Sequence, residues 1–380
     1  MVIVAVVLLL NLTAWSSTAF CDTYIEAVFP IWVNTYGRFT GLFPFSVGEI
    51  MLGLAVVVVL LAAVLWIPMM IIKLAGIIKP AENAEARMTV TKKIFRFLGK
   101  FYIFFVWTFL IVCLVMTLNC SILYHASTFS ETYFGEVDGE DYSLEELIAV
   151  RNMVVEECNR LSLLMERDEK GNILYDKNLG RQAILCMQQL GETYDRLDGY
   201  YPQPKPLYTS DFFSQQYMCG YYFPFSMEAN YNDVMYIMNK PSTLCHELAH
   251  LRGYIFEDEA NFISYLACIQ SQDVVFQYSG YLSVLNYLDN DFYKAVGRDR
   301  DAYLAQPLIT AQVIADNVFV TDEEWERIND KALIDTETVD EISDAVVDAT
   351  LKVNGVKDGM ISYNRVVQLL LLYYDSYEAE

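Results

Sequence analysis

The chain has 380 residues, of which 54% are hydrophobic and 20% are charged, and its formal net charge is −23 at pH 7. This length accommodates a membrane-embedded part together with one soluble domain that has its own core. The acidic balance argues against nucleic acid as a partner, because binding to phosphate backbones requires clustered Lys and Arg.

Three runs near the N-terminus, residues 1–21, 50–72 and 101–123, contain no Asp, Glu, Lys or Arg. Each is long enough for an apolar helix to cross a hydrocarbon layer of about 30 Å. The sequence therefore predicts a three-span transmembrane anchor over residues 1–123, in contact with membrane lipid. A cleaved signal peptide is the alternative for the first run, but the lack of basic residues before its apolar core favours an uncleaved anchor.

The distribution of basic residues predicts the orientation of this anchor. Segment 73–100 carries seven Lys and Arg residues against two Glu, so it is expected to be a cytoplasmic loop. The third span then delivers residues 124–380 to the outside, as the extracytoplasmic domain of a multi-pass cell membrane protein. Residues 120–380 hold 18 Lys and Arg against 44 Asp and Glu, which favours a soluble domain held away from anionic headgroups.

The eight cysteines are scattered without a CxxC pair, so the sequence predicts neither a disulfide framework nor a cysteine metal site. Outside the membrane, Cys158 could pair with Cys186, or Cys245 with Cys268, and the sequence leaves this open. His125, just after the third span, is expected at the membrane interface.

The extracytoplasmic part opens with two expected amphipathic helices. Ser143 and Glu146 have the pattern of a capping box, and apolar residues then recur at three- and four-residue steps until Gly171 ends the run. A second helix is predicted over about residues 178–197, and the two suggest a helical hairpin. Segment 200–210 contains three prolines and is expected to be a loop, whereas the aromatic segment 218–232 predicts one or two short strands.

Helices dominate the remaining sequence. One is predicted from a cap at Ser242 or Thr243 to Arg252, where Gly253 can take the left-handed conformation that ends a helix. Further helices are expected over residues 257–272, 286–297, 322–333 and 336–353. Residues 363–374 are too short for a fourth span and predict a buried helix. The expected fold is membrane-anchored α+β, with a mainly helical domain and a small sheet beside the Ser242 helix.

The decisive stretch begins at Cys245, reads CHELAH and contains the HExxH motif. On a helix, His246 and His250 are one turn apart and project from the same face, so two imidazole nitrogens can converge on one zinc ion. Glu247 points beside the metal, where its carboxylate can accept a proton from water. Chance occurrence is the alternative, but the chain has only three histidines and two of them form this motif.

Zinc requires a third protein ligand, and Glu257 is the candidate. Gly253 permits a sharp reversal, after which a helix that begins at Glu257 returns beside the first one with a carboxylate in its first turn. Asn261 lies one turn further on the same face, where it can hydrogen-bond a ligand and fix its orientation. Glu259 points about 200° away around the helix and is the less favoured alternative.

HELAH followed by EDEAN resembles the gluzincin pattern, in which HExxH is followed by a Glu with Ala at +3 and Asp or Asn at +4. This resemblance implies a zincin-like fold with Glu257 as third ligand, although the segment between His250 and Glu257 is shorter than in many gluzincins. The wider chain resembles an uncharacterised bacterial family of multi-span membrane proteins regarded as zinc peptidases. That resemblance covers nearly the whole chain. The segments that carry it are 228–230, CHELAH, EDEANF, 277–281, 357–359 and 363–374.

Peptidases of this kind usually bind the substrate backbone along a strand beside the active helix. Glu228, Ala229 and Asn230 lie in the only suitable upstream segment, and an ordinary core strand is an equal alternative. A group that stabilises the oxyanion is also expected, and its candidates are Tyr278, Tyr281, Tyr363 and Arg365.

The sequence thus predicts a membrane-anchored zinc metallopeptidase that hydrolyses peptide or protein substrates outside the cytoplasm, with water activated by zinc and Glu247. The alternative is a non-catalytic membrane sensor or assembly protein with a structural or vestigial zinc site. The intact Glu247 argues against this alternative, because a structural site usually closes its fourth position with another protein ligand. Cleavage inside the bilayer is disfavoured, because HExxH lies outside all three uncharged runs.

Overall fold

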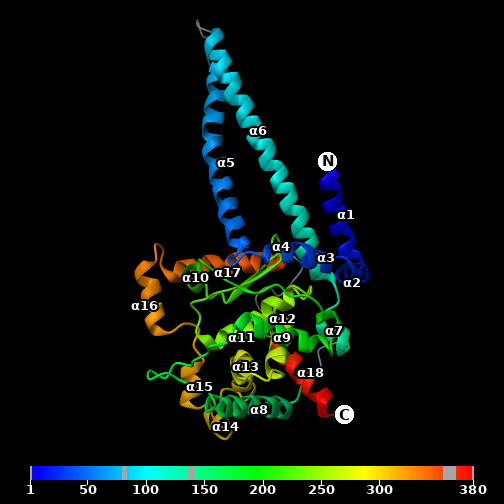
Figure 1. Ribbon diagram of the computed structural model, residues 1–380, viewed down its shortest axis with the longest axis vertical. Helices are drawn as coiled ribbons and strands as arrows, with labels where there is room; N and C mark the ends of the chain where they lie inside the picture. Colours follow the sequence, from blue (N-terminus) through cyan, green and yellow to red (C-terminus); the bar gives the residue numbers. More distant parts are fainter. Residues whose placement is uncertain (1, 79–83, 136–141, 354–364, 379–380) are drawn as a thin grey trace.

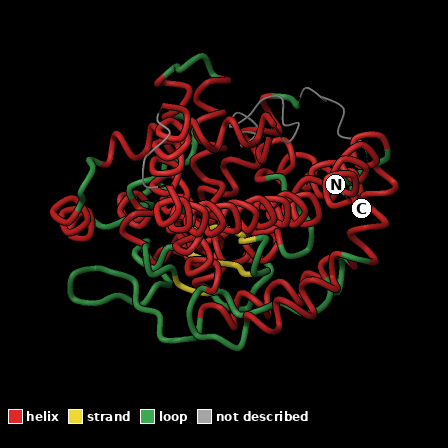
Figure 2. Tube along the Cα trace, turned by 90° about the horizontal axis from the view of Figure 1, so that it is seen from above, coloured by secondary structure: helices red, strands yellow, loops and turns green. Residues whose placement is uncertain are grey.

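The computed structural model describes residues 2–78, 84–135, 142–353 and 365–378, and it shows a mostly helical protein with one small sheet. Two long helices, α5 (Val47–Ile78) and α6 (Ala84–Met116), project together from a helical domain, and α1 (Val2–Ser16) stands beside the base of α6 (Figure 1). Viewed from above, the few strands lie near the middle of the domain, among helices (Figure 2). The expected combination of apolar N-terminal helices and a mainly helical domain with a small sheet is therefore confirmed.

Two of the described helices are long and apolar enough to cross a membrane, over Val47–Ile67 and Arg96–His125. Their side chains are almost entirely uncovered by the rest of the protein, as expected for surfaces that face lipid. The second passes through a π-helical turn (Thr117–Ser121) and a 3-10 turn (Leu123–His125) as it enters the domain. The second and third predicted spans thus have the required length and composition.

The first predicted span, over residues 1–21, is not one straight helix. Helix α1 ends at Ser16, and Ser17 caps α2 (Thr18–Ala27) by accepting from the Phe20 amide, with a bend of 114° between the two segments. Fifteen residues of helix reach only about 22 Å, which is less than a hydrocarbon core. A third crossing exists only if the bent pair counts as one span.

The predicted basic loop at 73–100 is largely helical. Helix α5 continues to Ile78 and α6 begins at Ala84, so only residues 79–83 within that segment lie outside the described ranges. The described parts of the segment, residues 73–78 and 84–100, form the end of the helical pair that is farthest from the domain (Figure 1). The basic segment and the domain therefore lie at opposite ends of the two helices, which is the arrangement that the predicted topology needs.

Three consecutive helices form the centre of the domain: α11 (Lys240–His250), α12 (Glu257–Ile269) and α13 (Val274–Ala295). Helix α8 (Leu144–Ser162) packs against α13, whereas α9 (Leu179–Gly191) packs against α11 and α12. The predicted hairpin of α8 with α9 is therefore wrong. Each helix buries its apolar stripe against a different central helix, and the intervening segment 163–178 is long enough to separate them.

The sheet has three short strands, β1 (Lys205–Pro206), β2 (Gly220–Phe223) and β3 (Glu228–Tyr231), in the order β1-β3-β2. Strand β2 is antiparallel to β3, and β1 is parallel to it. The predicted strands in segment 218–232 are confirmed. Strand β1 falls in the proline-rich segment predicted to be a loop, where Pro206 is tolerated because β1 lies at an edge of the sheet.

Shorter helices surround this centre. The predicted helices near 322–333 and 336–353 are confirmed as α16 (Asp322–Lys331) and α17 (Thr336–Val353), and the one at 286–297 is the end of the longer α13. The predicted buried terminal helix is α18 (Val366–Glu378), whose apolar residues join the core. The remaining elements are α3 (Phe29–Trp32), the π-helical turn Val33–Gly37, α4 (Arg38–Thr40), α7 (Phe129–Tyr133), α10 (Ser210–Ser214), α14 (Arg300–Leu304), α15 (Ala311–Asp316), and 3-10 turns at Asp195–Leu197 and Ile237–Asn239.

A buried carboxylate joins the sheet to the base of α5. Glu228 on β3 accepts hydrogen bonds from the backbone amides of Val47 (3.2 Å) and Gly48 (2.7 Å), which are free donors at the start of that helix. The Lys205 ammonium pairs with the same carboxylate and also donates to the Thr40 carbonyl at 2.7 Å. Glu228 and Lys205 are both nearly inaccessible, so this interaction fixes the start of α5 to the sheet.

Replacing Glu228 with Ala leaves Lys205 and the first amides of α5 buried without their partner. We expect the free energy of unfolding to fall by about 3 kcal/mol, the usual consequence of breaking a buried ion pair. Urea unfolding of the full chain in detergent, followed by tryptophan fluorescence, measures the loss. The matched control is Glu157→Ala, which removes a solvent-exposed pair with Arg160 and should cost less than about 1 kcal/mol. Equal losses in the two variants would contradict the structural role of Glu228.

Candidate metal centre and its cavity

The HExxH residues occupy the last two turns of α11. The helix begins at Lys240, and the side chain of its N-cap, Asn239, makes no capping hydrogen bond, so the predicted cap at Ser242 or Thr243 is wrong. Pro241 in the first turn explains the earlier start, because proline lacks an amide donor and its φ suits this position. His250 and Glu247 are each only 4% exposed, so the face of the helix that carries them points into the protein rather than toward bulk solvent.

The chain reverses at Gly253, whose φ of +84° lies in the left-handed region that favours glycine. The Arg196 side chain donates to the Gly253 carbonyl (3.1 Å) and lies over the Tyr254 ring, with its guanidinium carbon 4.0 Å from the ring centre. A Cβ atom on Gly253 would also approach Ile25 to 3.0 Å. The turn is therefore fixed by its own backbone and by side chains packed around it, and α12 begins four residues later.

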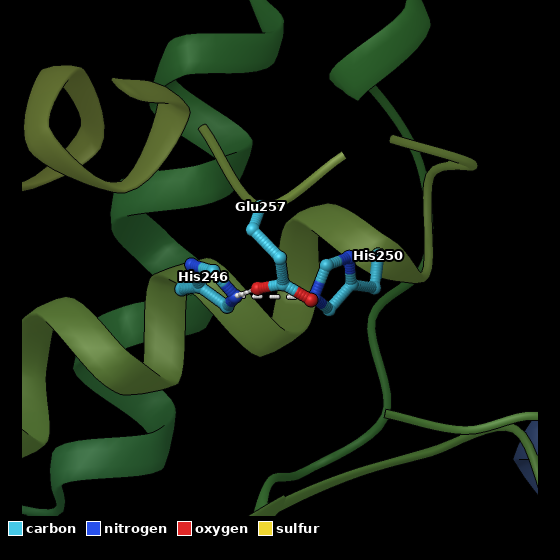
Figure 3. Close-up of side chains that lie close together, drawn as sticks. All are labelled: His246, His250 and Glu257. Atoms are coloured by element: carbon cyan, nitrogen blue, oxygen red, sulfur yellow. Dashed lines mark hydrogen bonds and ion pairs between the residues drawn. The ribbon is translucent and has the colours of Figure 1, made fainter. Parts of the chain in front are cut away.

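The reversal brings Glu257, the first residue of α12, between the two histidines (Figure 3). The Nε2 atoms of His246 and His250 are 3.1 Å apart, and the Glu257 oxygens lie 3.0 Å from the first and 3.9 Å from the second. Ligand atoms around a tetrahedral zinc ion are separated by about 3.3 Å, given metal distances near 2 Å. The three predicted ligand residues thus meet in one place, at spacings that suit such an ion.

Neighbouring oxygens fix the orientation of both imidazole rings. His246 Nδ1 is 2.8 Å from the Asn261 side-chain oxygen, and His250 Nδ1 is 2.7 Å from the Tyr254 carbonyl. An acceptor at Nδ1 holds the proton there, which leaves the lone pair of Nε2 directed toward Glu257. The structure therefore places Asn261 beside His246 as predicted from the sequence, and it adds the Tyr254 carbonyl, which the sequence analysis missed.

The alternative acid, Glu259, points away from this cluster. It accepts from the Ser130 hydroxyl at 2.6 Å and from the Ser130 amide at 3.2 Å, and it is buried there. Asp258 is also directed elsewhere, toward Arg365 at 3.3 Å. Of the three acids in the first turn of α12, only Glu257 faces the histidines.

The protonation states of His246, His250 and Glu257 depend on one another and on their burial. Burial lowers the pKa of His250 to about 4, so this ring stays neutral near pH 7. Burial opposes the charge on His246 too, but its hydrogen bond to Glu257 and the negative charges of Glu257 and Glu247 together outweigh burial and raise its pKa. Burial likewise opposes ionisation of Glu257, and the two histidines hold its pKa below the usual value. A divalent cation would replace the shared proton between His246 and Glu257.

Glu247 lies next to the cluster with one oxygen free. Its Oε2 atom has no hydrogen-bond partner among the described residues, and burial raises the pKa of its carboxyl to about 8. Gly220 at the start of β2 provides the space for this side chain, because a Cβ there would lie 2.8 Å from the Glu247 Oε1 atom. Burying an unpaired carboxylate lowers the stability of the folded state. Such groups are typical of sites where a side chain donates or accepts a proton.

The cluster opens into a cavity of about 750 Å³. Its walls come from β2 (Gly220, Tyr221 and Tyr222), from α13 (Leu282 and Tyr287), from α17 (Asp340 and Asp344) and from Cys120 at the end of the α6 segment. None of the described residues that line it is Lys or Arg. The cavity is large enough for several residues of an extended peptide.

Three of the predicted oxyanion stabilisers, Tyr278, Tyr281 and Arg365, are not among the described residues that line this cavity. The Tyr278 hydroxyl donates to Asp316 (2.8 Å), the Tyr281 ring packs edge-on against Tyr265, and Arg365 pairs with Asp258. Tyr363 lies outside the described residues. Four described tyrosines line the cavity: Tyr217, Tyr221, Tyr222 and Tyr287. Tyr287 is the one on α13, six residues beyond Tyr281 and nine beyond Tyr278. A sequence with 27 tyrosines offers no signal that separates it from the others.

The residues predicted as a possible substrate strand form the central strand of the sheet, as the alternative of an ordinary core strand expects. Glu228, Ala229 and Asn230 belong to β3, which has β1 on one side and β2 on the other, and all three are buried. Strand addition requires a free edge, and among the described strands β2 has such an edge beside α11. Strand order depends on contacts distant in the sequence, so the segment alone could not reveal it.

The cysteines form no part of this centre. All eight lie in described ranges and carry free thiols, so neither pairing left open by the sequence is present. Cys245 and Cys268 come closest, with 3.8 Å between their sulfur atoms in the core.

Comparison with known proteins gives one match. The model of a family described as "Protein of unknown function (DUF3810)" matches residues 24–371. No curated protein and no solved structure matches the chain. The family description states no activity, so the gluzincin resemblance of the HELAH and EDEAN motifs stays a prediction.

The contact between Asn261 and His246 predicts a measurable effect on metal affinity. Asn261→Ala should weaken zinc binding by about 10- to 100-fold, because the imidazole loses the acceptor that orients it. Asn261→Asp keeps an acceptor and should bind zinc at least as tightly as the wild type. Competition with a fluorescent chelator measures both. Asn290→Ala, on the exposed side of α13, is the control and should leave the zinc affinity unchanged. Wild-type affinity in Asn261→Ala would contradict the orienting role.

Proposed function

The chain belongs to the family described as protein of unknown function (DUF3810), and we propose that it is a membrane-anchored zinc peptidase that hydrolyses peptide bonds outside the cytoplasm. One observation carries the proposal: two imidazoles and one carboxylate converge beside a buried, unpaired glutamate at the wall of a peptide-sized cavity. The basic segment at the far end of α5 and α6 supports the orientation, because Lys and Arg flanking a span are retained in the cytoplasm.

His246, His250 and Glu257 would hold the metal. Zinc bound there would act as a Lewis acid that polarises the substrate carbonyl and makes water more acidic. The described residues supply three ligand side chains, and the cluster faces the cavity, which is the open arrangement of a catalytic rather than a structural site.

Glu247 is assigned the role of general base. Its side chain lines the cavity beside the cluster, and its unpaired carboxylate can accept a proton from a water that attacks the carbonyl carbon. A cation held by the cluster would stabilise the ionised carboxylate and so counteract the raised pKa of the metal-free state. The same carboxyl then passes the proton to the leaving amine, and its burial slows exchange of that proton with bulk water.

The cavity walls suit an extended peptide. The free edge of β2 offers backbone donors and acceptors from Gly220 onward, next to Glu247. Tyr287 lies in the wall near Glu257, and burial together with the nearby Cys219 and Glu257 raises its pKa, so it remains a hydroxyl donor. We assign it the role of stabilising the oxyanion.

The function is tested on purified full-length protein with an unbiased pool of peptides, read out by mass spectrometry, and with metal analysis of the same samples. Glu247→Gln should keep zinc and lose at least about 100-fold in turnover. His246→Ala and Glu257→Ala should lose both zinc and activity. Glu259→Gln is the matched control, because this acid contacts Ser130 instead, and it should retain zinc and activity.

Two results would reject the proposal. Undiminished hydrolysis by Glu247→Gln would exclude the assigned chemistry. A zinc ion coordinated by four protein atoms, measured by X-ray absorption spectroscopy, would favour the alternative of a non-catalytic sensor or assembly protein.

The assignment of Tyr287 has its own test. Tyr287→Phe removes only the hydroxyl and should lower kcat by about 100-fold with little change in KM, because an oxyanion forms in the transition state and not in the bound substrate. Tyr281→Phe is the matched control on the same helix and should leave kcat unchanged. Equal effects of the two substitutions would show that Tyr287 acts through packing alone.

A further inference from the structure

The hairpin of β2 and β3 connects the catalytic helix to the base of α5. At one end, Gly220 lies so close to Glu247 that no side chain fits between them. At the other end, Phe223 packs on Gly48, where a Cβ would lie 2.7 Å from the Phe223 ring. Glu228, which pairs with Phe223 in the sheet, binds the first amides of α5. Strand β2 therefore runs from the base of an apolar helix directly to the general base.

The length of β2 sets the distance between these two points. Its four residues, Gly220–Phe223, cover about 10 Å at the rise of an extended strand. The candidate span Val47–Ile67 begins at the same turn of α5 that Phe223 contacts, and its first strongly exposed apolar side chain is Ile50. The outer boundary of the apolar layer thus lies about 10 Å from the site of chemistry.

Helix α6 gives an independent estimate of the same boundary. Its exposed apolar side chains end at Val112, and Cys120, eight residues later, lines the cavity. Eight helical residues span about 12 Å. The π-helical turn that holds Cys120 also contacts the hairpin, because the Asn119 carbonyl accepts from the Tyr222 hydroxyl at 3.3 Å. Two different candidate spans therefore place the cavity at the same short distance from the bilayer.

A third surface lies at the same level. Residues 28–45, named here the interfacial segment, carry Arg38 as their single charged residue. The segment lies across the base of the apolar helices (Figure 1) and exposes Ile31, Trp32, Tyr36, Phe39, Leu42 and Phe43, with Leu42 77% exposed. Aromatic side chains prefer the headgroup region of a bilayer. The interfacial segment thus fits the lipid surface that the two spans define.

From this geometry we propose that the substrate is a polypeptide anchored in the same bilayer, which pairs along the edge of β2 and is cut within about 4 to 8 residues of its membrane anchor. The proposal depends on the peptidase function above and narrows it to a substrate class. Hydrolysis adds the hydroxyl of water to the carbonyl carbon and its proton to the amine, so one product stays in the membrane and the other is released. Anchoring also raises the local concentration of the substrate at the cavity.

The test uses full-length protein reconstituted in phosphatidylcholine and phosphatidylglycerol vesicles. The substrates share one sequence that the protein cuts as a free peptide, joined to a single apolar helix through Gly-Ser spacers of about 0, 5, 10 and 20 residues. We expect the anchored forms to be cut at least about tenfold faster than the free peptide. We also expect the cut, mapped by mass spectrometry, to stay at a constant distance from the anchor as the spacer lengthens.

Substitution of the interfacial segment separates membrane positioning from chemistry. Phe39→Ser with Leu42→Ser should slow cleavage of the anchored substrates by about tenfold and leave hydrolysis of the free peptide unchanged. Leu333→Ser is the matched control, because this leucine is fully exposed elsewhere on the domain, and it should affect neither.

The outcomes distinguish this inference from the function on which it depends. If free and anchored peptides are cut equally fast, and the cut follows the sequence rather than the anchor, the protein is a peptidase but the inference is wrong. If Glu247→Gln cuts both substrates as fast as the wild type, the proposed function itself fails.

Discussion

A left-handed backbone conformation at one residue holds the candidate centre together. With Gly253 at φ +84°, the chain turns within a few residues and α12 starts against the end of α11, so Glu257 reaches both histidines. The same turn exposes the Tyr254 carbonyl to His250 Nδ1 and places Asn261 beside His246. The convergence of the three candidate ligands and the orientation of both rings therefore depend on one short connection, which Arg196 contacts through the Gly253 carbonyl.

Buried charge is concentrated where elements of different parts of the chain must meet. Glu228 and Lys205 pair beneath the first turn of α5, and Glu259 binds Ser130 behind the metal centre. Such groups are expensive to bury and stable only with full sets of partners. Asp258 lacks hydrogen-bond partners among the described residues but forms an ion pair with Arg365. Glu247 differs from these acids, because its Oε2 atom has no hydrogen-bond partner there and the residue forms no ion pair in the described part of the chain.

Local patterns in the sequence predicted most of the secondary-structure elements. They did not predict which elements distant in the sequence pack against each other. Amphipathic periodicity located α8 and α9 but could not show that each packs on a different central helix. Aromatic alternation located the β2 and β3 hairpin but not the position of β3 in the centre of the sheet. Uncharged length predicted a first span over residues 1–21, whereas a serine cap at Ser17 divides it into two bent helices. The first two failures concern contacts between segments distant in the sequence, whereas the cap at Ser17 is a local feature that the length of the uncharged run does not reveal.

The sequence by itself determined the candidate metal centre, because HExxH, Gly253 and Glu257 lie within a dozen residues and helical geometry relates them directly. It also determined the apolar helices and the acidic domain. Only the tertiary structure decided which strand has a free edge, that Tyr287 rather than Tyr278 or Tyr281 lines the cavity, and that Glu228 binds α5. These features join residues far apart in the chain, and their proximity arises from packing of the whole core rather than from the spacing of neighbours.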